Sequence, residues 1–388
     1  MVKADVAIVG NGVAGFACAA RLARHGWRPL LVGPGLPVDR PPLTKTALAS
    51  GVPTLLADES RLAERGIGRL DGTVTDADLL AGSLDVDTAA GVIQVDAELI
   101  VIATGLTYEP PPVPGLEAAF VNADPLQFDV LAARLAAGSR RVLVVGAGLI
   151  GVESAATLAA AGHEVTIVDL LPRPLDRLHD PVPALARRAL DELGVRFVGE
   201  VHVERLEPVG PSSASAPDPR GSGDVRMTTA EHGTFTAELV LAATGGRPAA
   251  PPGLSSAELP LAVDATMRVP GYERVYAAGD LVLVPHARFG AIRFPHWDAA
   301  IGTGEQTADS IAGVAGPYER LPYWWSDIGT LRLAEVGVAE QVAEWHDLGG
   351  MHVGRDVSGE VVCALVVDEP RRLREARGLV GDVARGGA

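Results

Sequence analysis

The first forty residues carry the hydrophobic pattern of a strand, a turn, a helix and a second strand. A short apolar run covers residues 6–9 and the sequence GNGVAG ends it. Residues 13–26 then place apolar side chains at helical spacing, and residues 30–32 are apolar again. A strand period followed by a helix period and another strand is typical of a βαβ unit. The pattern therefore predicts an α/β protein.

The same pattern occurs again 136 positions later, where residues 141–169 read RVLVV, GAGLIG, a helix rich in Ala and Leu, and EVTIVD. Downstream, LIVIATG (99–105) resembles LVLAATG (239–245) at an offset of 140. A fixed offset indicates an internal repeat, so we expect two Rossmann-like dinucleotide-binding domains. The matched glycines are Gly10, Gly12 and Gly15 in the first copy and Gly146, Gly148 and Gly151 in the second.

Other segments separate these two domains from each other and from a third. PPPVPG (110–115) is stiff and proline-rich, which suits a linker. Residues 208–224 are polar and rich in helix and strand breakers, which predicts a surface loop without chemistry. From about residue 316, alternating apolar positions predict strands of a small α+β domain, and RRLREARGLV predicts a basic helix after them.

Charge and cysteine use exclude several classes of protein. The 388 residues carry a net charge of −16, which argues against a nucleic-acid or anionic-membrane partner. No apolar run approaches the ~18 residues of a membrane span, and the glycine spacing explains the N-terminal segment better than a signal peptide does. Cys18 and Cys363 are in no C-x-x-C pair, so we expect a cytoplasmic protein. We expect no metal site, and the oligomeric state stays open.

Each glycine motif predicts a site for the phosphates of a dinucleotide, because the glycines permit a tight turn and the following helix offers free N–H groups. An acid at the end of the second strand should bind the adenosine ribose. In the second copy this acid is Asp169, which disfavours the extra phosphate of NADPH. NADH is therefore favoured, although Arg173 and Arg177 follow and could pair with that phosphate instead.

The first copy lacks this acid. Its second strand ends LLVGPG, with Gly33, Pro34 and Gly35 where the acid should be. Asp39 is a candidate replacement.

Seven motifs together resemble the FAD-dependent pyridine nucleotide oxidoreductases, within them the ferredoxin, putidaredoxin and rubredoxin reductase branch. They are GNGVAG (10–15), RPPLTK (40–45), IATG (102–105), GAGLIGVE (146–153), VYAAGD (275–280), RFPHWDAA (293–300) and PYWWSD (322–327), and they span nearly the whole chain. The resemblance implies that the first fold binds FAD and the second NAD(P)H. It also implies a discontinuous FAD-binding domain (1–109 and 242–315), an NAD(P)H-binding domain (110–241) and a C-terminal domain (316–388).

The resemblance further implies individual cofactor contacts. Asp280 would touch the ribityl and pyrophosphate part of FAD, and Arg40 would lie near the FAD phosphates. Besides the glycines, the remaining implied contacts are Lys45, Thr104, Gly105 and Trp297 for FAD, and Glu153, Asp169, Arg173 and Gly245 for NAD(P)H.

RPPLTK occupies the position where disulfide reductases of the same superfamily carry a redox C-x4-C. Without that cysteine pair, electrons must leave the flavin directly. The chain has only two lysines, Lys3 and Lys45, and the resemblance places Lys45 near the reactive edge of the flavin beside Glu153. A fixed ammonium there would stabilise negative charge on the reduced ring, and a carboxylate would orient it. A solvated loop lysine, and a Glu153 that only complements a helix dipole, are the alternatives.

PYWWSD implies an aromatic wall, with Trp325 near the isoalloxazine on the side of the electron acceptor. Ordinary core packing is the alternative for Tyr323, Trp324 and Trp325. His296 is a candidate proton donor, although a packing histidine is the commoner role.

Three departures from the family pattern fall in the last motifs. The usual Asn and Gln after Trp297 are Ala299 and Thr303, and Ile328 replaces the Gln after Ser-Asp. Together with the missing acid, they suggest a weaker hold on FAD or an altered acceptor.

Three functions follow from these observations. The first is an NADH-dependent FAD flavoprotein reductase that passes electrons to a ferredoxin-type iron–sulfur protein of an oxygenase system. The second is a flavoenzyme that acts directly on a small-molecule acceptor or oxygen, and the third is a non-catalytic nucleotide-binding protein. A basic run could be the docking face for an acidic ferredoxin or simply a solvated helix; it contains Arg371, Arg372, Arg374 and Arg377.

Overall fold

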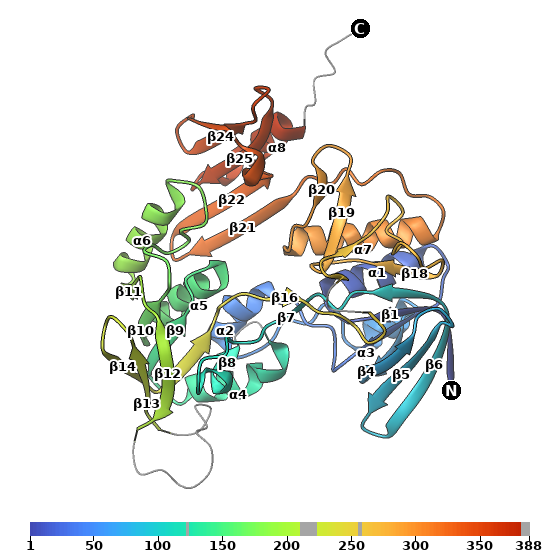
Figure 1. Cartoon of the computed structure of the whole chain (residues 1–388), viewed down its shortest axis with the longest axis horizontal. Helices are drawn as coiled ribbons and strands as arrows, with labels where there is room; N and C mark the ends of the chain where they lie inside the picture. Colours follow the sequence, from blue (N-terminus) through green and yellow to red (C-terminus); the bar gives the residue numbers. More distant parts are fainter. Residues whose placement is uncertain (122–123, 210–222, 255–257, 382–388) are drawn as a thin grey trace.

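The computed structural model describes residues 1–121, 124–209, 223–254 and 258–381. It contains three sheet-based units, which lie at the right, the left and the top of Figure 1. Most of the loop expected at 208–224 lies outside the described residues.

The first unit is a seven-stranded sheet in the order β3-β2-β1-β6-β5-β4, with β18 also paired to β6. Five strands form its parallel part: β1 (Val2–Val9), β2 (Pro29–Gly33), β3 (Gly68–Asp71), β6 (Gly91–Ile102) and β18 (Val275–Ala277). The antiparallel edge consists of β4 (Thr73–Asp78) and β5 (Ser83–Thr88). The unit is discontinuous in sequence, because β18 joins the sheet after the whole second unit.

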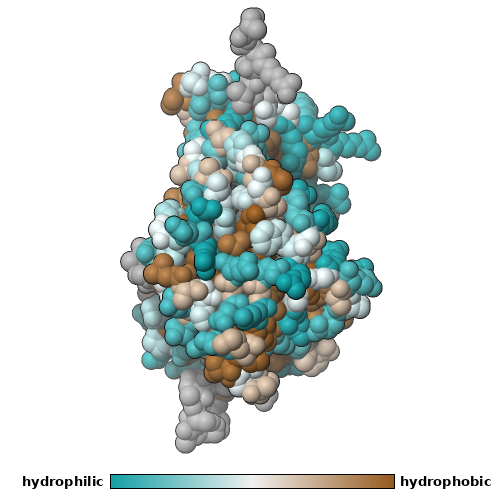
Figure 2. Space-filling model, turned by 90° about the vertical axis from the view of Figure 1, so that its right-hand side faces the viewer, coloured by the Kyte–Doolittle hydropathy of each residue, from teal (hydrophilic) through white to brown (hydrophobic). Residues whose placement is uncertain are grey.

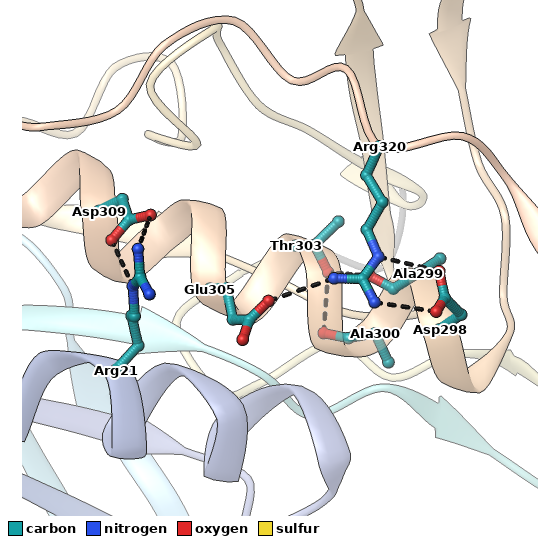
Figure 3. Close-up of polar contacts among 8 residues, drawn as sticks. All are labelled: Arg21, Asp298, Ala299, Ala300, Thr303, Glu305, Asp309 and Arg320. Carbon is teal, nitrogen blue, oxygen red and sulfur yellow. Dashed lines mark hydrogen bonds and ion pairs between the residues drawn. The ribbon is translucent and has the colours of Figure 1, made fainter. Parts of the chain in front are cut away.

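Helices α1 (Val13–Arg24) and α7 (Trp297–Ile311) pack side by side in this unit (Figure 1). Small residues permit the close approach, since a Cβ on Gly304 would lie 2.4 Å from the carbonyl oxygen of Ala14. Ion pairs flank the contact: Arg21 Nε lies 2.7 Å from Asp309 Oδ1, and Arg320 Nη2 lies 2.8 Å from Asp298 Oδ1 (Figure 3). The first helix of the chain is thus held against one that lies almost 300 positions later.

The second unit is a five-stranded parallel sheet in the order β11-β10-β9-β15-β8. Its strands are β8 (Phe120–Val121), β9 (Arg141–Val145), β10 (Glu164–Val168), β11 (Arg196–Val198) and β15 (Leu239–Ala242). The helices are α4 (Pro125–Ala136), α5 (Leu149–Ala160) and α6 (Val182–Glu192). A three-stranded antiparallel sheet adjoins it, formed by β12 (Val203–Pro208), β13 (Val225–Thr229) and β14 (Thr234–Ala237).

The backbone confirms the internal repeat that the sequence predicts. The N–H of Gly10 donates to the carbonyl of Val32, and the N–H of Gly146 donates to the carbonyl of Val168, both over 2.8 Å. Both members of the second pair lie 136 positions after the first, so the two parallel folds share one register at the glycine turn.

The third unit is an antiparallel sheet in the order β21-β22-β25-β24-β23. Its elements are β21 (Tyr323–Ile328), β22 (Leu331–Gly337), β23 (Glu344–Asp347), β24 (Met351–Arg355), β25 (Val361–Val367) and α8 (Leu373–Gly381). Helix α8 buries Ala376 and Val380 against this sheet. Strand β21 contributes Trp324 and Ile328 to the core of the second unit, which fixes the third unit on top of it (Figure 1).

Two short strands connect the first unit with the second. β7 (Leu106–Thr107) and β16 (Arg247–Pro248) pair antiparallel across the middle of Figure 1. The remaining elements of the first unit are η1 (Pro41–Thr44), α2 (Thr46–Ser50), α3 (Glu59–Glu64), β17 (Leu261–Ala262), β19 (Val282–His286) and β20 (Gly290–Ile292).

The surface of the first unit is mixed in character. On the face seen in Figure 2, hydrophobic residues occur in small groups separated by hydrophilic ones. Within the described residues, no helix has the length and apolar character that crossing a bilayer requires.

Candidate active site

One cavity of about 1220 Å³ runs from the glycine turn of the first unit to the glycine turn of the second. It lies between the two folds and reaches strand β21 of the third unit. All but two of the predicted site residues line it, the exceptions being Gly15 and Gly151. A continuous space of this extent can hold two nucleotides with their reactive ends close together.

The glycine turns explain why these two glycines lie outside the cavity. A Cβ on Gly15 would lie 2.0 Å from the carbonyl oxygen of Gly10, and a Cβ on Gly151 would lie 2.0 Å from that of Gly146. The third glycine of each motif therefore serves the packing of helix on turn. A Cβ on Gly12 would meet nothing within 4 Å, because that glycine faces the open cavity.

The first glycine of each motif is constrained by its backbone. Gly10 has a φ of +111° and Gly146 a φ of +106°, a region that residues with a side chain rarely adopt. A Cβ on Gly10 would also lie 2.3 Å from the carbonyl oxygen of Ala103. The two turns are thus built alike, each with free N–H groups at the start of a helix, which is what a pyrophosphate requires.

Asp280 provides an independent test of whether FAD fits the first unit. Its Oδ1 atom is buried and has no hydrogen-bond partner among the described residues, although the residue borders the cavity. Burial raises the pKa of Asp280 to about 6, against the opposing effect of Arg40 and Arg293. A buried acceptor without a donor is costly unless a ligand supplies one. A ribityl hydroxyl is such a donor, so the residues present fit FAD.

Helix α7 holds the backbone next to Asp280 in place. Thr303 Oγ1 accepts from the N–H of Gly279 over 2.9 Å. It donates to the carbonyl of Ala299 over 2.8 Å (Figure 3). The threonine that departs from the family pattern therefore holds the backbone next to Asp280.

Lys45 and Glu153 meet where the two folds face each other. Lys45 Nζ lies 3.2 Å from Glu153 Oε1 and 3.4 Å from Asp327 Oδ2. The structure thus brings together two predicted residues that are 108 positions apart in sequence. Lys45 is bound by carboxylates and borders the cavity, so it is not a solvated loop lysine.

Glu153 is buried, and two hydroxyls hold it in place. Thr44 Oγ1 donates to Oε2 over 2.7 Å, and Ser326 Oγ donates to Oε1 over 2.6 Å. Each oxygen of the buried carboxylate therefore receives a hydroxyl donor, and Oε1 also faces Lys45. Sequence reasoning missed Thr44 and Ser326, although both lie inside the quoted motifs RPPLTK and PYWWSD.

Aromatic rings close this end of the cavity. Lys45 Nζ lies 5.8 Å from the ring centroid of Trp325, and the Trp297 ring meets Trp325 edge to face at 5.6 Å. Trp324 points to the other side of β21, where its indole N–H donates to Glu335 Oε1 over 2.8 Å. Alternation along the strand thus points the two tryptophans to opposite faces of β21; both line the cavity, and Trp324 also belongs to the core of the second unit.

His296 packs between rings at the edge of the cavity. Its ring centroid lies 4.8 Å from that of Phe294 and 6.2 Å from that of Trp324. Burial lowers the pKa of His296 to about 4, so the imidazole is neutral at pH 7. It can offer one N–H to a ligand, but not a positive charge.

Asp169 follows strand β10 of the second fold and accepts hydrogen bonds from two backbone N–H groups. Its Oδ2 accepts from the N–H of Ala147 over 2.5 Å and its Oδ1 from the N–H of Leu171 over 2.7 Å. Arg173 forms ion pairs with Asp176 and, over 2.9 Å, with Asp180. These carboxylates compete with the phosphate of NADPH for Arg173.

The equivalent end of the first fold is built differently. Asp39, the candidate replacement acid, accepts from the indole N–H of Trp297 over 2.8 Å and is not among the residues that line the cavity. Asp39 therefore holds the Trp297 ring and does not line the cavity. Asn11 occupies the space beside the end of β2.

The structure changes two further expectations, one about Ile328 and one about the basic run. Ile328 is fully buried in the core of the second unit, so its departure from the family pattern affects packing and not the flavin side. In the basic run, Arg372 pairs with Glu375 over 3.0 Å, and Arg377 lies 4.5 Å from the ring of Tyr323. Arg371 and Arg374 are the exposed arginines of the run.

Comparison with known proteins agrees with this geometry. The family described as pyridine nucleotide-disulphide oxidoreductase matches residues 4–304. The chain is 30% identical to the ferredoxin reductase component of chlorobenzene dioxygenase from Cupriavidus sp. (strain PS12), over 97% of this chain and 93% of that protein. It is also 30% identical to the ferredoxin–NAD(+) reductase subunit of the benzene 1,2-dioxygenase system of Pseudomonas putida, over 97% and 92%.

Solved structures share the fold. The ferredoxin reductase for the CYP199A2 system from Rhodopseudomonas palustris aligns with a TM-score of 0.81 at 24% identity, covering 95% of this chain and 91% of that chain. Putidaredoxin reductase in its covalent complex with putidaredoxin aligns with a TM-score of 0.83 at 23% identity, covering 98% and 94%. The expected two Rossmann-like domains and third small domain are therefore the architecture of these reductases too.

Proposed function

We propose, because this chain belongs to the pyridine nucleotide-disulphide oxidoreductase family, that it is an NADH-dependent FAD reductase whose acceptor is a ferredoxin-type iron–sulfur protein of an oxygenase system. The chain is an FAD-dependent NAD(P)H oxidoreductase. Its relatives include reductase components of dioxygenase systems, which supports the acceptor.

The observation that carries the proposal is the pair formed by Lys45 and Glu153, 3.2 Å apart, where the two nucleotide folds face each other. No cysteine lines the cavity among the described residues, and both Cys18 and Cys363 are free and buried elsewhere. A thiol relay is therefore not built into this site. When bound, FAD supplies two-electron acceptance from NADH and one-electron delivery to an iron–sulfur protein.

The chain's own residues have the following roles in this proposal. The Lys45 ammonium stabilises negative charge that develops nearby, and Glu153 keeps the ammonium oriented. Thr44 and Ser326 hold Glu153 in place, so the pair is ordered before any ligand arrives. Trp325 excludes water on the side where an acceptor would approach.

The second fold binds NADH in preference to NADPH in this proposal, because the Asp169 carboxylate repels a 2′-phosphate. Arg173 is already paired with two aspartates. Arg177 lines the same part of the cavity and has no ion pair among the described residues. We assign residues 1–109 and 242–315 to the FAD-binding domain, 110–241 to the NADH-binding domain and 316–388 to the C-terminal domain.

The two free, buried cysteines support a reducing, cytoplasmic location. For the acceptor, Arg371 and Arg374 offer exposed positive charge to an acidic partner.

An anaerobic titration tests the proposal. The purified protein should carry flavin absorbance that NADH bleaches at lower concentration than NADPH, and cytochrome c reduction should accelerate several-fold when a ferredoxin is added. If NADH bleached the flavin but no ferredoxin accelerated cytochrome c reduction, the result would favour the alternative function, in which the flavin reduces a small-molecule acceptor directly. A protein that takes up no FAD would contradict the proposal as a whole.

A further inference from the structure

The loop that follows strand β10, residues 169–179, contacts two different parts of the molecule, and we call it the nucleotide loop. It begins at Asp169, and most of its residues as far as Leu178 line the cavity. The next residue, His179, is not among those that line the cavity and lies instead against the third unit. One loop thus carries the expected ribose acid at its start and a contact with the third unit at its end.

That contact is a stack of two rings. The ring centroids of His179 and Trp345 lie 3.8 Å apart, with an angle of 9° between the ring planes. His352 meets the His179 ring edge to face at 5.9 Å. Trp345 and His352 belong to one face of the third sheet, because Asp347, two residues after Trp345, is paired with His352. The nucleotide loop is therefore attached to the face of a hydrogen-bonded sheet.

The His179 ring fits this contact as a neutral group. Its Nε2 atom is buried and has no hydrogen-bond partner among the described residues. Burial lowers the pKa of His179, and His352 on β24 lowers it further, against the opposing effect of Asp180 on the chain beside it. An indole face attracts a cation, but this attraction is weaker than the penalty for a buried charged donor without an acceptor. Protonation of His179 therefore opposes the stack.

The backbone connects this stack with the nucleotide site. The N–H of Leu178 donates to the carbonyl of Leu175 over 2.8 Å, and the N–H of Leu175 donates to the carbonyl of Ala147 in the glycine turn over 2.9 Å. Leu175 is buried and has a φ of +54°, which a leucine rarely adopts, so its conformation depends on the packing around it. Holding the loop at His179 keeps Leu175, and with it the turn beside Asp169, in this arrangement.

We propose that His179 is a positioning residue for NADH: its stack on Trp345, formed by the neutral ring, holds the nucleotide loop in the arrangement that binds NADH. The inference rests on the proposed function, since it needs NADH in the second fold. It gives the third unit, which carries Trp325 of the aromatic wall, a second role in setting the affinity for the hydride donor.

Anaerobic stopped-flow absorbance tests the positioning role, because the dependence of flavin bleaching on NADH concentration separates the Kd of NADH from the limiting rate of reduction. At pH 7.5, His179→Ala should raise that Kd about threefold to tenfold, the range of one aromatic pair, with the limiting rate within about twofold of wild type. Trp345→Ala should do the same, and the double variant should add little to either change. An unchanged Kd in His179→Ala would overturn the inference, even if its Tm fell.

His179→Phe and His346→Ala are the matched controls. Phenylalanine can stack on Trp345 without titrating, so His179→Phe should keep the wild-type Kd at pH 7.5. His346 belongs to the other face of β23, where it lies 3.8 Å from Glu344, and its removal should leave both the Kd and the limiting rate unchanged. If His346→Ala were as impaired as His179→Ala, the effect would belong to the third unit in general and not to the stack.

The pH dependence tests the need for a neutral ring and does not use the alanine variants. Because stacking lowers the pKa of His179, the stack is complete above the ordinary histidine pKa of about 6.5 and weakens as the pH falls below it. From pH 7.5 to 5.5 the Kd of NADH for wild type should therefore rise relative to that for His179→Phe, by up to about tenfold. Glu335, whose pKa burial raises to about 7, is present in both proteins, as are His352 and Asp180. A constant ratio of the two Kd values would contradict the inference.

NMR of protein labelled with ¹³C-histidine gives a readout without turnover, and comparison with His179→Phe identifies the His179 signal. This signal should titrate below the free-histidine value, and saturating NAD⁺ should lower its midpoint further, because coupling between two binding events is reciprocal. A midpoint that NAD⁺ leaves in place would sink the inference. Protein that takes up no FAD, or whose flavin NADH does not bleach, would contradict the proposed function. Normal bleaching with a Kd that is insensitive to His179 would contradict this inference alone.

Discussion

The two nucleotide folds of this chain agree at the turn and differ at the strand end. Both turns begin with a glycine of positive φ, and both close a backbone bond of 2.8 Å to the second strand. At the strand end, Asp169 binds two backbone N–H groups in one fold, while Gly33 makes room for Asn11 in the other. The turns thus share a backbone that leaves no room for a side chain at the first glycine, whereas the two strand ends are built from different side chains.

The largest expected effect comes from breaking the shared feature. Gly10→Ala forces a positive φ on a residue with a side chain and drives its Cβ to 2.3 Å from a carbonyl oxygen. We expect roughly 3–5 kcal/mol lower free energy of unfolding and loss of FAD. Denaturant unfolding and flavin absorbance measure both.

Gly12→Ala is the matched control for this turn. Its Cβ would meet nothing within 4 Å, so it should keep the fold and lose only FAD affinity. Equal unfolding free energies for the two variants would contradict the assignment of strain to Gly10.

The next effect concerns the place where the folds meet. Lys45→Ala should slow flavin reduction by NADH about 10²–10³-fold, the scale of removing one fixed donor from a site of developing charge. The fold should persist, because Thr44 and Ser326 still donate to Glu153. Anaerobic stopped-flow absorbance measures the rate.

Lys45→Arg keeps the charge and should recover part of that rate, whereas Lys3→Ala should change nothing. A Lys45→Ala enzyme with wild-type reduction kinetics would remove Lys45 from the mechanism.

A smaller effect, on the pH dependence of stability, is expected from Asp280, the buried carboxylate of the first fold. Because the pKa of Asp280 is raised to about 6, the FAD-free protein keeps a proton that the unfolded chain releases near pH 4. The contribution of Asp280 to its stability should therefore fall by up to about 3 kcal/mol as the pH rises from 4 to 7, and then level off. Urea unfolding of FAD-free protein at several pH values measures this.

Asp280→Asn should flatten that pH dependence, and bound FAD should reduce it in wild type by supplying a hydrogen-bond donor. Because the titration of His296 contributes equally to both proteins, unfolding free energies of wild type and Asp280→Asn that change in parallel between pH 4 and 7 would refute the assignment.

The smallest effect sharpens the difference between the strand ends. Asp169→Ala should raise the Kd of NADH about tenfold to a hundredfold, the range of a charge-assisted hydrogen bond, with the Kd of FAD unchanged. Asp169→Asn keeps the shape without the charge and should bind NADPH better than wild type. Isothermal titration with both nucleotides decides the point, and unchanged NADH affinity in Asp169→Ala would argue against this acid as the ribose ligand.

The sequence predicted the features that repeat or that lie close together in the chain. The offset of 136 located both glycine turns, because turn and helix signals are local. Family motifs brought Lys45 to Glu153, which the structure places 3.2 Å apart. Asn11 escaped notice because its partner strand end is 22 positions away, and the contact appears only when β1 and β2 lie in register. Ile328 was misread because strand alternation alone does not say which face meets the second unit.

The paired linkers β7 and β16 have a mechanical consequence for electron transfer. A single linker would let one fold swivel about the other, but two strands joined by hydrogen bonds behave as a ribbon. The bond from Thr104 Oγ1 to the carbonyl of Ala249, at 2.8 Å, ties the start of this ribbon to the edge of the cavity. A ribbon resists twisting, so the glycine turns of the two folds keep one relative orientation across the cavity.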